Sequence, residues 1–498
     1  MTSPTKASAE GAGAESGGLD ARVLKIAAVV VLGAIMSILD TTVVAVAQNT
    51  FQDVFNTSAA SAAWTATGYT LALAAVIPLS SWAAARFGTK KVYLTSLVLF
   101  VIGSILCAFA WNIGSLVAFR MLQGAGGGML MPVGMMILTR AAGPERVGSV
   151  MAVLGVPMLL GPIAGPILGG VLIEYVSWHW IFLINVPIGI LAFLYSAWIL
   201  EDDDEKTRPP FDFVGLLLLS PGLALFLYGV SSSNDAGTFI AAKVLIPMVI
   251  GAALIIGFVF HALRGANKNP LIDLRLFKNP TLSWTVVTFS LFLIAFFGAS
   301  LLFPQYFIGV RGESTLMAGL LVAPQGLGAM ITMPIAGRMT DKIGPGKFVL
   351  TGIVLIAFGL GTFMFLGAGT SYWILGAALF VQGLGMGMSM MPMMSAALAT
   401  LSADKVADGS TLVNVVQQTA ASVGTAVISV ILASNLKSVT PPTPSGLAGA
   451  FGDTFVVAVV LIILCLVPAF FLPRKKVSVH TEIGADGEPV KAAPVMMH

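Results

Sequence analysis

The stretch FRMLQGAGGGM, residues 119–129, contains the pattern QGxGxG, and the same pattern returns in LFVQGLGMGM at residues 379–388, an offset of 259 positions. A second pair of segments agrees with the first. SWAAARFGTKK (81–91) and GRMTDKIGPGK (337–347) share their spacing, with Gly344 matching Gly88 at an offset of 256. Because two separate segments repeat at nearly the same offset, the sequence predicts two related halves joined by an intervening segment.

The composition is that of an integral membrane protein. The 498 residues are 57% hydrophobic and only 10% charged, whereas soluble proteins carry about 25% charged residues. The formal net charge of +3 and the lack of a clustered basic face argue against a nucleic-acid partner. Both cysteines, Cys107 and Cys465, lie in apolar runs and lack metal-ligand or redox spacing, so we expect them to be core residues.

Fourteen apolar segments are long enough to cross a bilayer, because a spanning helix needs about 20 residues. If both termini are cytoplasmic, nearly all of the 26 Lys and Arg residues fall on the cytoplasmic side, as the positive-inside rule requires. Lys243, Arg311 and Lys437 lie on the opposite side, and Arg120 lies within a span. An even number of spans follows from having both termini on one side.

The repeats and the spans together divide the chain. The first repeat element follows the second span and its copy follows the tenth, which predicts two six-helix halves separated by two extra helices. Transporters are often built from such repeats. The expected divisions are a disordered cytoplasmic tail at 1–22, an N-terminal six-helix bundle at 23–200, a linker with extra helices 7 and 8 at 201–281, a C-terminal six-helix bundle at 282–472 and a cytoplasmic tail at 473–498.

One carboxylate interrupts the apolar run SILDTTVVAVAQ, residues 37–48. An ionisable group inside a span costs on the order of 3 kcal/mol on insertion scales, so Asp40 is a functional candidate by default. Asp40 and Arg120 are the two charges that the sequence places deep in the membrane. Each lies about 7 residues from the outer end of its span, roughly 10 Å at 1.5 Å per residue, so we expect them to be level with one another.

Four motifs resemble those of a known family. LDTTVVAVA (39–47), LVAFRMLQGAGGG (116–128), GPIAGPILGGVL (161–172) and WHWIFLINVPIG (178–189) are similar to motifs in the first, fourth, fifth and sixth helices of the fourteen-helix drug:proton antiporters of the major facilitator superfamily, the EmrB/QacA type. The likeness runs from about residue 23 to 472. It implies the major facilitator fold, with 14 transmembrane helices as two six-helix bundles plus two extra central helices.

The resemblance assigns Asp40 and Arg120 to proton coupling; the alternative is a static ion pair that only joins two helices. Leu379 occupies the position of Arg120 in the second half, so coupling would belong to the N-terminal bundle. The fifth-helix motif implies export, and its small residues would let the helix rock against a partner in the other half, although mere tight packing is the alternative. Its residues are Gly161, Gly165, Pro166, Gly169 and Gly170.

The two repeated loops resemble the cytoplasmic gating loop of the superfamily, GxxxDRxGRK. The first copy departs from that pattern, with Ser81 in place of Gly and Ala85 in place of Asp. We therefore expect Asp341, with Lys342 and Arg338, to form the charged latch, while the first loop could equally serve only membrane orientation. The residues assigned to gating are Arg86, Gly88, Lys90, Gly337, Arg338, Asp341, Lys342 and Gly344.

The substrate cavity is less well defined by the sequence. Polar and aromatic residues within spans are candidates, as is the Met-rich stretch MGMSMMPMM (386–394), because flexible thioethers suit a surface that re-packs around different ligands. Trp178 and Trp180 are expected to be interface anchors. The cavity candidates are Trp64, Tyr69, Asn185, Phe303, Gln305, Tyr306, Met390, Asn414, Gln417 and Gln418.

No sequence signature of an enzyme is present: there is no P-loop, no HExxH, no nucleophile elbow and no ligand-spaced His cluster. We expect a secondary transporter without cofactor or metal, in the bacterial inner membrane, with the proton gradient as its energy source. Its partners would be lipophilic or cationic small molecules, protons and the lipid bilayer, with a periplasmic adaptor left open. An exporter or proton-coupled importer of a native metabolite or lipid is the alternative, and a non-transporting sensor is a third possibility.

Overall fold

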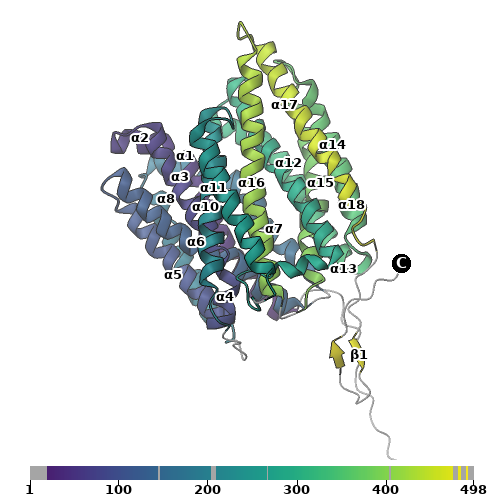
Figure 1. The fold of residues 1–498 in the computed structure, drawn as a ribbon. Coiled ribbons are helices and arrows are strands. Elements are labelled where there is room, and N and C mark those ends of the chain that lie inside the picture. Colours follow the sequence, from purple (N-terminus) through teal and green to yellow (C-terminus); the bar gives the residue numbers. More distant parts are fainter. Residues whose placement is uncertain are drawn as a thin grey trace, which may run out of the picture.

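The computed structural model describes residues 20–143, 146–202, 209–265, 267–402, 405–474, 481–483 and 489–491. The two predicted tails therefore lie mostly outside the described residues. Helices dominate the described chain (Figure 1). The first helices are α1 (Ala21–Val46), α2 (Gln48–Phe55), α3 (Ala59–Val76), α4 (Leu79–Phe87), α5 (Thr89–Ala108), α6 (Ile113–Ala142), α7 (Val147–Tyr175), α8 (Trp180–Leu183) and α9 (Asn185–Ile199). The helices that follow are α10 (Phe213–Ala236), α11 (Ala242–Leu263), the 3-10 turn η1 (Leu274–Lys278), α12 (Pro280–Gly309), α13 (Thr315–Ile343), α14 (Gly346–Thr362), η2 (Phe363–Phe365), α15 (Tyr372–Ala399), α16 (Val406–Lys437), α17 (Pro444–Leu464) and α18 (Leu466–Ala469).

Many of these helices have the length and hydropathy of membrane spans. Among the described residues, 12 helices qualify, or up to 13 if the bent pair α3–α4 is counted as one span. α7 is a further helix of 29 residues. The all-α membrane fold is confirmed, while the count of fourteen spans stays a prediction.

The bent pair α3–α4 lies where the sequence predicts a single span. The sequence predicts one continuous span near residues 62–85, but the two helices meet at an angle of 55°. The break falls at Ile77 and Pro78. Proline lacks the N–H that would continue the helix, and its ring clashes with the carbonyl four residues earlier, so the helix bends there.

The sequence repeat is also a repeat of contacts. A Cβ placed on Gly126 of α6 would lie 2.6 Å from the Phe100 nitrogen of α5, and one on Gly385 of α15 would lie 2.9 Å from the Ile356 nitrogen of α14. Gly126 and Gly385 differ by 259 positions, and Phe100 and Ile356 by 256. The same backbone approach therefore occurs twice, and only glycine permits it.

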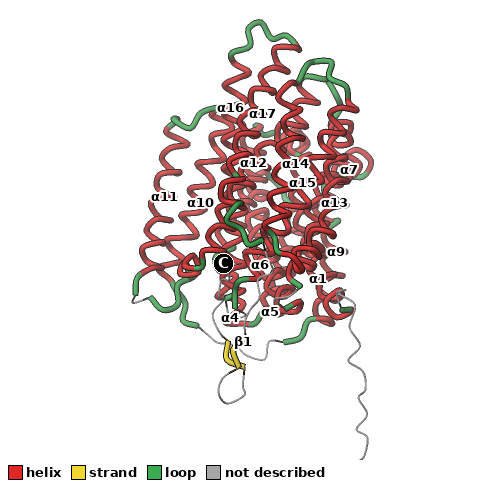
Figure 2. The backbone as a smooth tube through the Cα atoms, turned by 90° about the vertical axis from the view of Figure 1, so that its right-hand side faces the viewer, coloured by secondary structure: helices red, strands yellow, loops and turns green. Residues whose placement is uncertain are grey.

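The helices form two groups and an added pair. α1, α3, α5, α6, α7 and α9 pack together, α12 to α17 form a second group, and α10 packs against α11, α3 and α16. Figure 1 shows the first group in purple and blue and the second in green and yellow, and Figure 2, turned by 90°, shows α10 and α11 along one side. Below, these are called the first group, the second group and the added pair.

One end of the molecule carries the basic connections at 86–91, 264–278 and 338–347, and is called the basic end below. Ser81 Oγ donates to the Leu271 carbonyl there, at 3.2 Å. Asp20, before α1, pairs with Arg146, and the Gly346 nitrogen donates to the Pro473 carbonyl. The start of α1 and the end of α18 thus lie at the same end, as an even number of crossings requires.

Asp212 ties the added pair together at the basic end. It caps α10 by accepting from the Gly215 nitrogen at 2.9 Å, and it also accepts from the Leu271 nitrogen and contacts His261 Nε2 at 2.7 Å. Partial burial raises the pKa of Asp212, but these hydrogen bonds outweigh it and hold the pKa below its usual value. The connection that follows α11 is thereby held against both α10 and α4.

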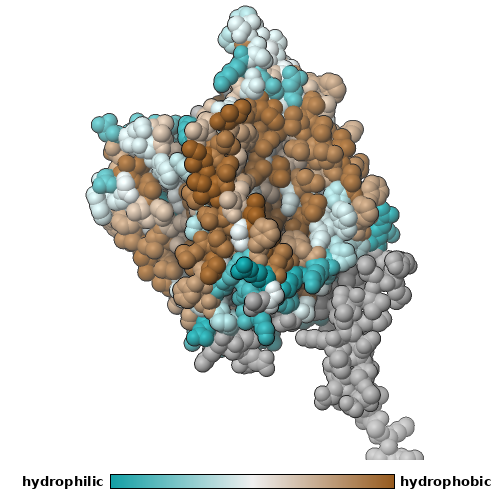
Figure 3. Space-filling view, viewed as in Figure 1, coloured by the Kyte–Doolittle hydropathy of each residue, from teal (hydrophilic) through white to brown (hydrophobic). Residues whose placement is uncertain are grey.

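The sides of the helices expose hydrophobic side chains, as expected of a protein that lies in lipid. Large apolar side chains on the helix sides are exposed, with Trp198 76% and Phe358 72% accessible. Figure 3 shows a broad hydrophobic band over the helices, with hydrophilic residues at the two ends. Patches of this extent are typical of surfaces that face a membrane.

A small hairpin lies beyond the helices. β1 (Thr481–Ile483) pairs antiparallel with β2 (Pro489–Lys491), and Thr481 lies opposite Lys491. The sequence analysis predicts no strand in this tail, because three-residue strands are too short to produce a periodic pattern.

Candidate functional site: a buried charge network

The two charges predicted to be level in the membrane are in contact. Arg120 Nη1 on α6 donates to Asp40 Oδ2 on α1 at 2.5 Å, and each residue is only 1% exposed. Removing one partner of a buried ion pair costs about 3–5 kcal/mol, because the remaining charge is left without compensation. The pair therefore holds α1 to α6 strongly.

Two amides complete the surroundings of the carboxylate. Gln123 Nε2 donates to Asp40 Oδ1 at 2.7 Å, and Asn185 Nδ2, at the start of α9, donates to the same oxygen at 2.9 Å. Both amides also donate to Ser104 Oγ of α5, at 2.6 and 3.0 Å. Side chains of α6 and α9 thus bind the carboxylate on α1, and α5 joins them through the two amides.

The arginine has further partners besides Asp40. Its Nη1 donates to Gln123 Oε1 at 2.7 Å, and its Nε donates to the Thr65 carbonyl of α3 at 3.1 Å. The guanidinium carbon lies 4.1 Å from the centre of the Tyr69 ring, a distance that allows cation–π attraction. Tyr69, a cavity candidate in the sequence analysis, therefore lies against the arginine.

Sequence reasoning found part of this network and missed the rest. Asn185 was expected to face a substrate cavity, but it hydrogen-bonds Asp40. Gln123 and Ser104 were not predicted. Gln123 could have been found, because it lies three residues after Arg120 and so shares a face of α6. Ser104 could not have been found from the sequence, because many serines occur in the spans.

The glycines of the fifth-helix motif face α1 of the same group. A side chain at Gly161 would meet Ile38, one at Gly165 would meet Thr42, and a Cβ at Gly169 would lie 3.3 Å from the Val43 carbonyl. These small residues therefore pack against α1, which agrees with the alternative of tight packing, while rocking of α7 against the other half stays a prediction. Gly170 has open space around its Cβ position, and the side chain of Pro166 lies outside the described residues.

α7 meets the second group closer to the basic end. Asp341, near the end of α13, accepts hydrogen bonds from the Gly148 nitrogen at 2.8 Å and the Ser149 nitrogen at 2.9 Å, and from Ser149 Oγ at 2.7 Å. It thus acts as a cap for the first turn of α7, where unsatisfied N–H groups and the helix dipole favour a negative charge. A Cβ at Gly337 would lie 2.6 Å from the Gly148 carbonyl, so the two backbones are in close contact.

The other residues assigned to the loops have different surroundings. Arg86, Arg338 and Lys342 are exposed, Lys90 is half-buried, and none of them forms an ion pair with another described residue. Asp341 thus contacts the opposite group through backbone N–H groups of α7, and a charged latch with Lys342 and Arg338 stays a prediction. Gly88 and Gly344 end α4 and α13 with φ of +91° and +87°, a region that favours glycine.

Further contacts join the two groups near the basic end. Ser80 Oγ lies 2.8 Å from Thr411 Oγ1, and Asn414 Nδ2 lies 3.1 Å from Met135 Sδ. Lys405, before α16, pairs with Asp273 at 2.8 Å. Asp273 belongs to the connection after α11, so this connection is held to the start of α16.

The remaining cavity candidates are scattered. Phe303 and Tyr306 are fully buried; the Phe303 ring packs against Phe363 and Phe455, and Tyr306 donates to the Gly367 carbonyl. This corrects the expectation that they face a central pocket, since aromatic neighbours enclose them. Trp64 is 41% exposed and stacks on Tyr228, 5.5 Å away. Met390 is buried, Gln305 is exposed, and Gln417 and Gln418 are half-buried.

The buried charge network lies within one of two repeated groups of membrane-spanning helices, an arrangement often found in transporters. The sequence profile of the Major Facilitator Superfamily matches residues 30–425, and the chain belongs to this superfamily. The chain is 46% identical over 496 residues to the multidrug resistance protein B homolog of Mycobacterium tuberculosis (strain ATCC 25618 / H37Rv), with 92% of each chain covered. It is 28% identical to the lincomycin resistance protein LmrB of Bacillus subtilis (strain 168), covering 85% of this chain and 90% of that protein.

The fold has counterparts among solved structures. The human organic anion transporter MFSD10 superposes with a TM-score of 0.64 at 15% identity, covering 91% of this chain and 100% of that chain. The profile match and the bacterial relatives confirm the family expected from the sequence motifs. The chain is a multi-pass membrane transporter and not an enzyme.

Proposed function

We propose that this transporter exports hydrophobic, cationic or amphipathic drugs across the bacterial cytoplasmic membrane in exchange for protons, with both termini in the cytoplasm. The observation that carries the proposal is the Asp40 carboxylate, which is removed from solvent yet held by Arg120, Gln123 and Asn185. The names of the bacterial relatives, one of multidrug resistance and one of lincomycin resistance, support the substrate class.

Coupling follows from the way that Asp40 is held. Protonation of the carboxylate would remove its charge attraction to Arg120, and any motion that separates α1 from α6 would open Asp40 to protons. The network joins five helices, α1, α3, α5, α6 and α9, so its protonation state and the packing of the first group depend on one another. A proton that arrives from outside would release the drug and reset the carrier, and no cofactor takes part.

The contacts between the groups support an outward-open arrangement. The hydrogen bonds of Asp341, Ser80 and Asn414 across the groups lie toward the basic end, which we take as cytoplasmic. In Figure 1 the two groups diverge toward the opposite end. Closure at one end and divergence at the other is the arrangement that alternating access requires.

The decisive test is proton release driven by ethidium in reconstituted vesicles. We expect Asp40→Asn to bind ethidium but to lose coupled transport, while Asp53→Asn, the same change at an exposed acid of α2, keeps it. Coupled transport by Asp40→Asn at the native rate would show that Asp40 and Arg120 form only a structural ion pair.

The alternative is export, or proton-coupled import, of one native metabolite or lipid. Cells without the gene would then accumulate, or fail to take up, that compound and would keep normal drug sensitivity. In the vesicle assay an importer moves substrate and protons in the same direction, whereas the proposed antiporter moves them in opposite directions.

A further inference from the structure

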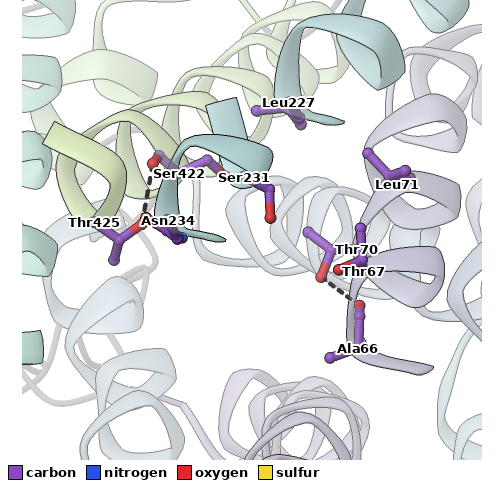
Figure 4. Close-up of a pocket in the computed structure, with 9 residues that line it drawn as sticks. All are labelled: Ala66, Thr67, Thr70, Leu71, Leu227, Ser231, Asn234, Ser422 and Thr425. Atoms are coloured by element: carbon purple, nitrogen blue, oxygen red, sulfur yellow. Dashed lines mark hydrogen bonds between the residues drawn. The ribbon is translucent and has the colours of Figure 1, made fainter. Parts of the chain in front are cut away.

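A cavity of about 180 Å³ lies where α3, α10 and α16 meet (Figure 4). It is built from one helix of the first group, one of the added pair and one of the second group. The lining residues are Ala66, Thr67, Thr70, Leu71, Leu227, Ser231, Asn234, Ser422 and Thr425. None of them was a site candidate in the sequence analysis, and none belongs to the Asp40 network.

The cavity lies in the half of the molecule away from the basic end. α10 begins at the basic end, and the cavity residues Leu227, Ser231 and Asn234 occupy its last ten residues. At 1.5 Å per residue this is within roughly 15 Å of the far end of the helix. The cavity is therefore separate from the contacts that close the basic end.

The lining is polar but uncharged. Six of the nine residues carry a hydroxyl or an amide, and none carries a charge. Three hydroxyls already donate to carbonyls of their own helices: Thr70 to Ala66 at 3.0 Å, Ser422 to Gln418 at 3.0 Å and Thr425 to Ala421 at 2.9 Å. Their oxygens keep lone pairs for a donor on a ligand.

The other polar groups also have capacity for a ligand. Among the described residues, Thr67, Ser231 and Asn234 have no hydrogen-bond partner for their side chains. The Asn234 amide offers both donors and an acceptor. A hydroxyl group of a ligand, which donates and accepts, matches this mixture. A cation does not, because it would lose its hydration without gaining an opposite charge.

The volume of the cavity limits which ligands fit in it. Pockets that hold a whole drug-sized molecule measure about 300–1,000 Å³, so about 180 Å³ admits only part of an amphiphile. Leu71 and Leu227 provide the apolar part of the wall, and the stacked rings of Trp64 and Tyr228 lie one helical turn from Thr67 and Ser231. We propose that this cavity binds the uncharged, hydroxyl-bearing end of an amphipathic molecule.

A ligand in this cavity contacts both the first group and the second group of helices. α3 belongs to the first group and α16 to the second, so any motion that changes their separation changes the cavity. A molecule bound here therefore favours the arrangement in which the cavity has the observed width, and it acts separately from protonation of Asp40.

The test is protection of an introduced thiol in nanodiscs. Ser231→Cys and, on the facing helix, Ser422→Cys each place a thiol in the cavity with little change of size, while the native Cys107 and Cys465 are buried. We expect 1-octanoylglycerol, present at four times its dissociation constant, to slow labelling by N-ethylmaleimide about fivefold in both variants, because only one fifth of the sites stay free.

Two controls make the result specific. Octyltrimethylammonium has the same chain length but a cationic head, and it should leave labelling unchanged. Ser232→Cys, at the neighbouring position of α10 outside the lining, should be labelled at the same rate with and without octanoylglycerol. Absence of protection in both cavity variants, or equal protection by the cation, would overturn the proposal. The labelling needs no proton gradient, so its failure would not affect the coupling assigned to Asp40.

The bound amphiphile could be a transported compound or a resident lipid of the outer leaflet. Ser231→Leu, which fills the cavity, separates these sources. Loss of octanoylglycerol efflux in this variant, with Ser232→Leu unaffected, identifies a transported compound; retained efflux identifies a resident lipid. Both results support the site, since both presuppose the protection seen with Ser231→Cys.

Discussion

Gln123 in the first group and Gln382 in the second occupy the same position of the repeat, yet their surroundings differ. Each is at most 1% exposed, and each packs against a glycine, Gly103 and Gly359 respectively. Gln123 bonds to Asp40, Arg120 and Ser104. Neither amide atom of Gln382 has a hydrogen-bond partner among the described residues.

The neighbours explain this difference. Leu379 stands in the second group where Arg120 stands in the first, and α12 has no acidic residue anywhere along its length. The two groups therefore share the close packing of their helices, whereas, among the described residues, only the first group has the buried ion pair. Close helix packing and the buried charge network are therefore separable in this fold.

The largest loss of stability and transport should come from a substitution that makes the first group resemble the second. Arg120→Leu leaves Asp40 buried without its cation, and we expect about 3–5 kcal/mol of destabilisation, seen as a lower Tm in detergent, together with loss of transport. Arg338→Leu, at an exposed arginine, is the matched control. The pair Arg120→Leu with Asp40→Ala should regain stability without regaining transport. An unchanged Tm for Arg120→Leu alone would show that the ion pair is unimportant for stability.

A smaller loss of stability and coupling is expected at Gln123, the glutamine of the first group. Gln123→Leu removes the donor to Asp40 Oδ1 and the acceptor from Arg120, and hydrogen bonds to charged groups contribute about 1.5–3 kcal/mol each. Thermal unfolding in detergent measures the stability, and ethidium-driven proton release measures coupling. Native coupling in Gln123→Leu would restrict the functional network to Asp40, Arg120 and Asn185.

The loops of the two groups provide a third comparison, since Asp341 has no acidic counterpart at Ala85. Asp341→Ala removes the cap of α7, which is worth about 1–2 kcal/mol. We expect the two groups to separate more often at the basic end, measured as a longer distance between spin labels at Arg86 and Arg338. Asp53→Ala is the control at an exposed acid. An unaltered distance distribution would exclude Asp341 as a latch.

The smallest change in stability is expected at Gln382, and it should be a gain. Gln382→Leu replaces a buried amide without partners by an apolar group, and we expect a gain of about 1 kcal/mol, because an unsatisfied buried polar group costs about 1–3 kcal/mol. Transport should be unchanged. A loss of stability would mean that Gln382 has hydrogen-bond partners in the membrane, and the contrast with Gln123 would then disappear.

Several features of the site were predictable from the sequence. The depth of Asp40 and Arg120 follows from counting residues along apolar runs, because a helix rises by a constant 1.5 Å per residue. Their contact in the structure agrees with that count. The matching positions of Gly88 and Gly344 also follow from the repeat, and the structure adds that both end a helix with a positive φ.

Other features depend on which face of each helix turns inward. Asn185 and Ser104 reach Asp40 only because α9 and α5 pack beside α1 and α6 with those faces inward. Phe303 and Tyr306 are surrounded by aromatic rings of α17 and η2, so they face the interior of the second group. In spans that are apolar all round, hydrophobic periodicity does not identify the inward face.

The sequence by itself determined the membrane class, the family, the two-fold repeat and the pair of intramembrane charges, because these depend on composition, spacing and local helix geometry. Only the tertiary structure decided the partners of Asp40, the cap that Asp341 provides to α7, and the uncharged cavity at α3, α10 and α16. Each of these joins residues at least 80 positions apart. Such contacts are set by how the helices rotate and pack against one another, which local sequence patterns do not specify.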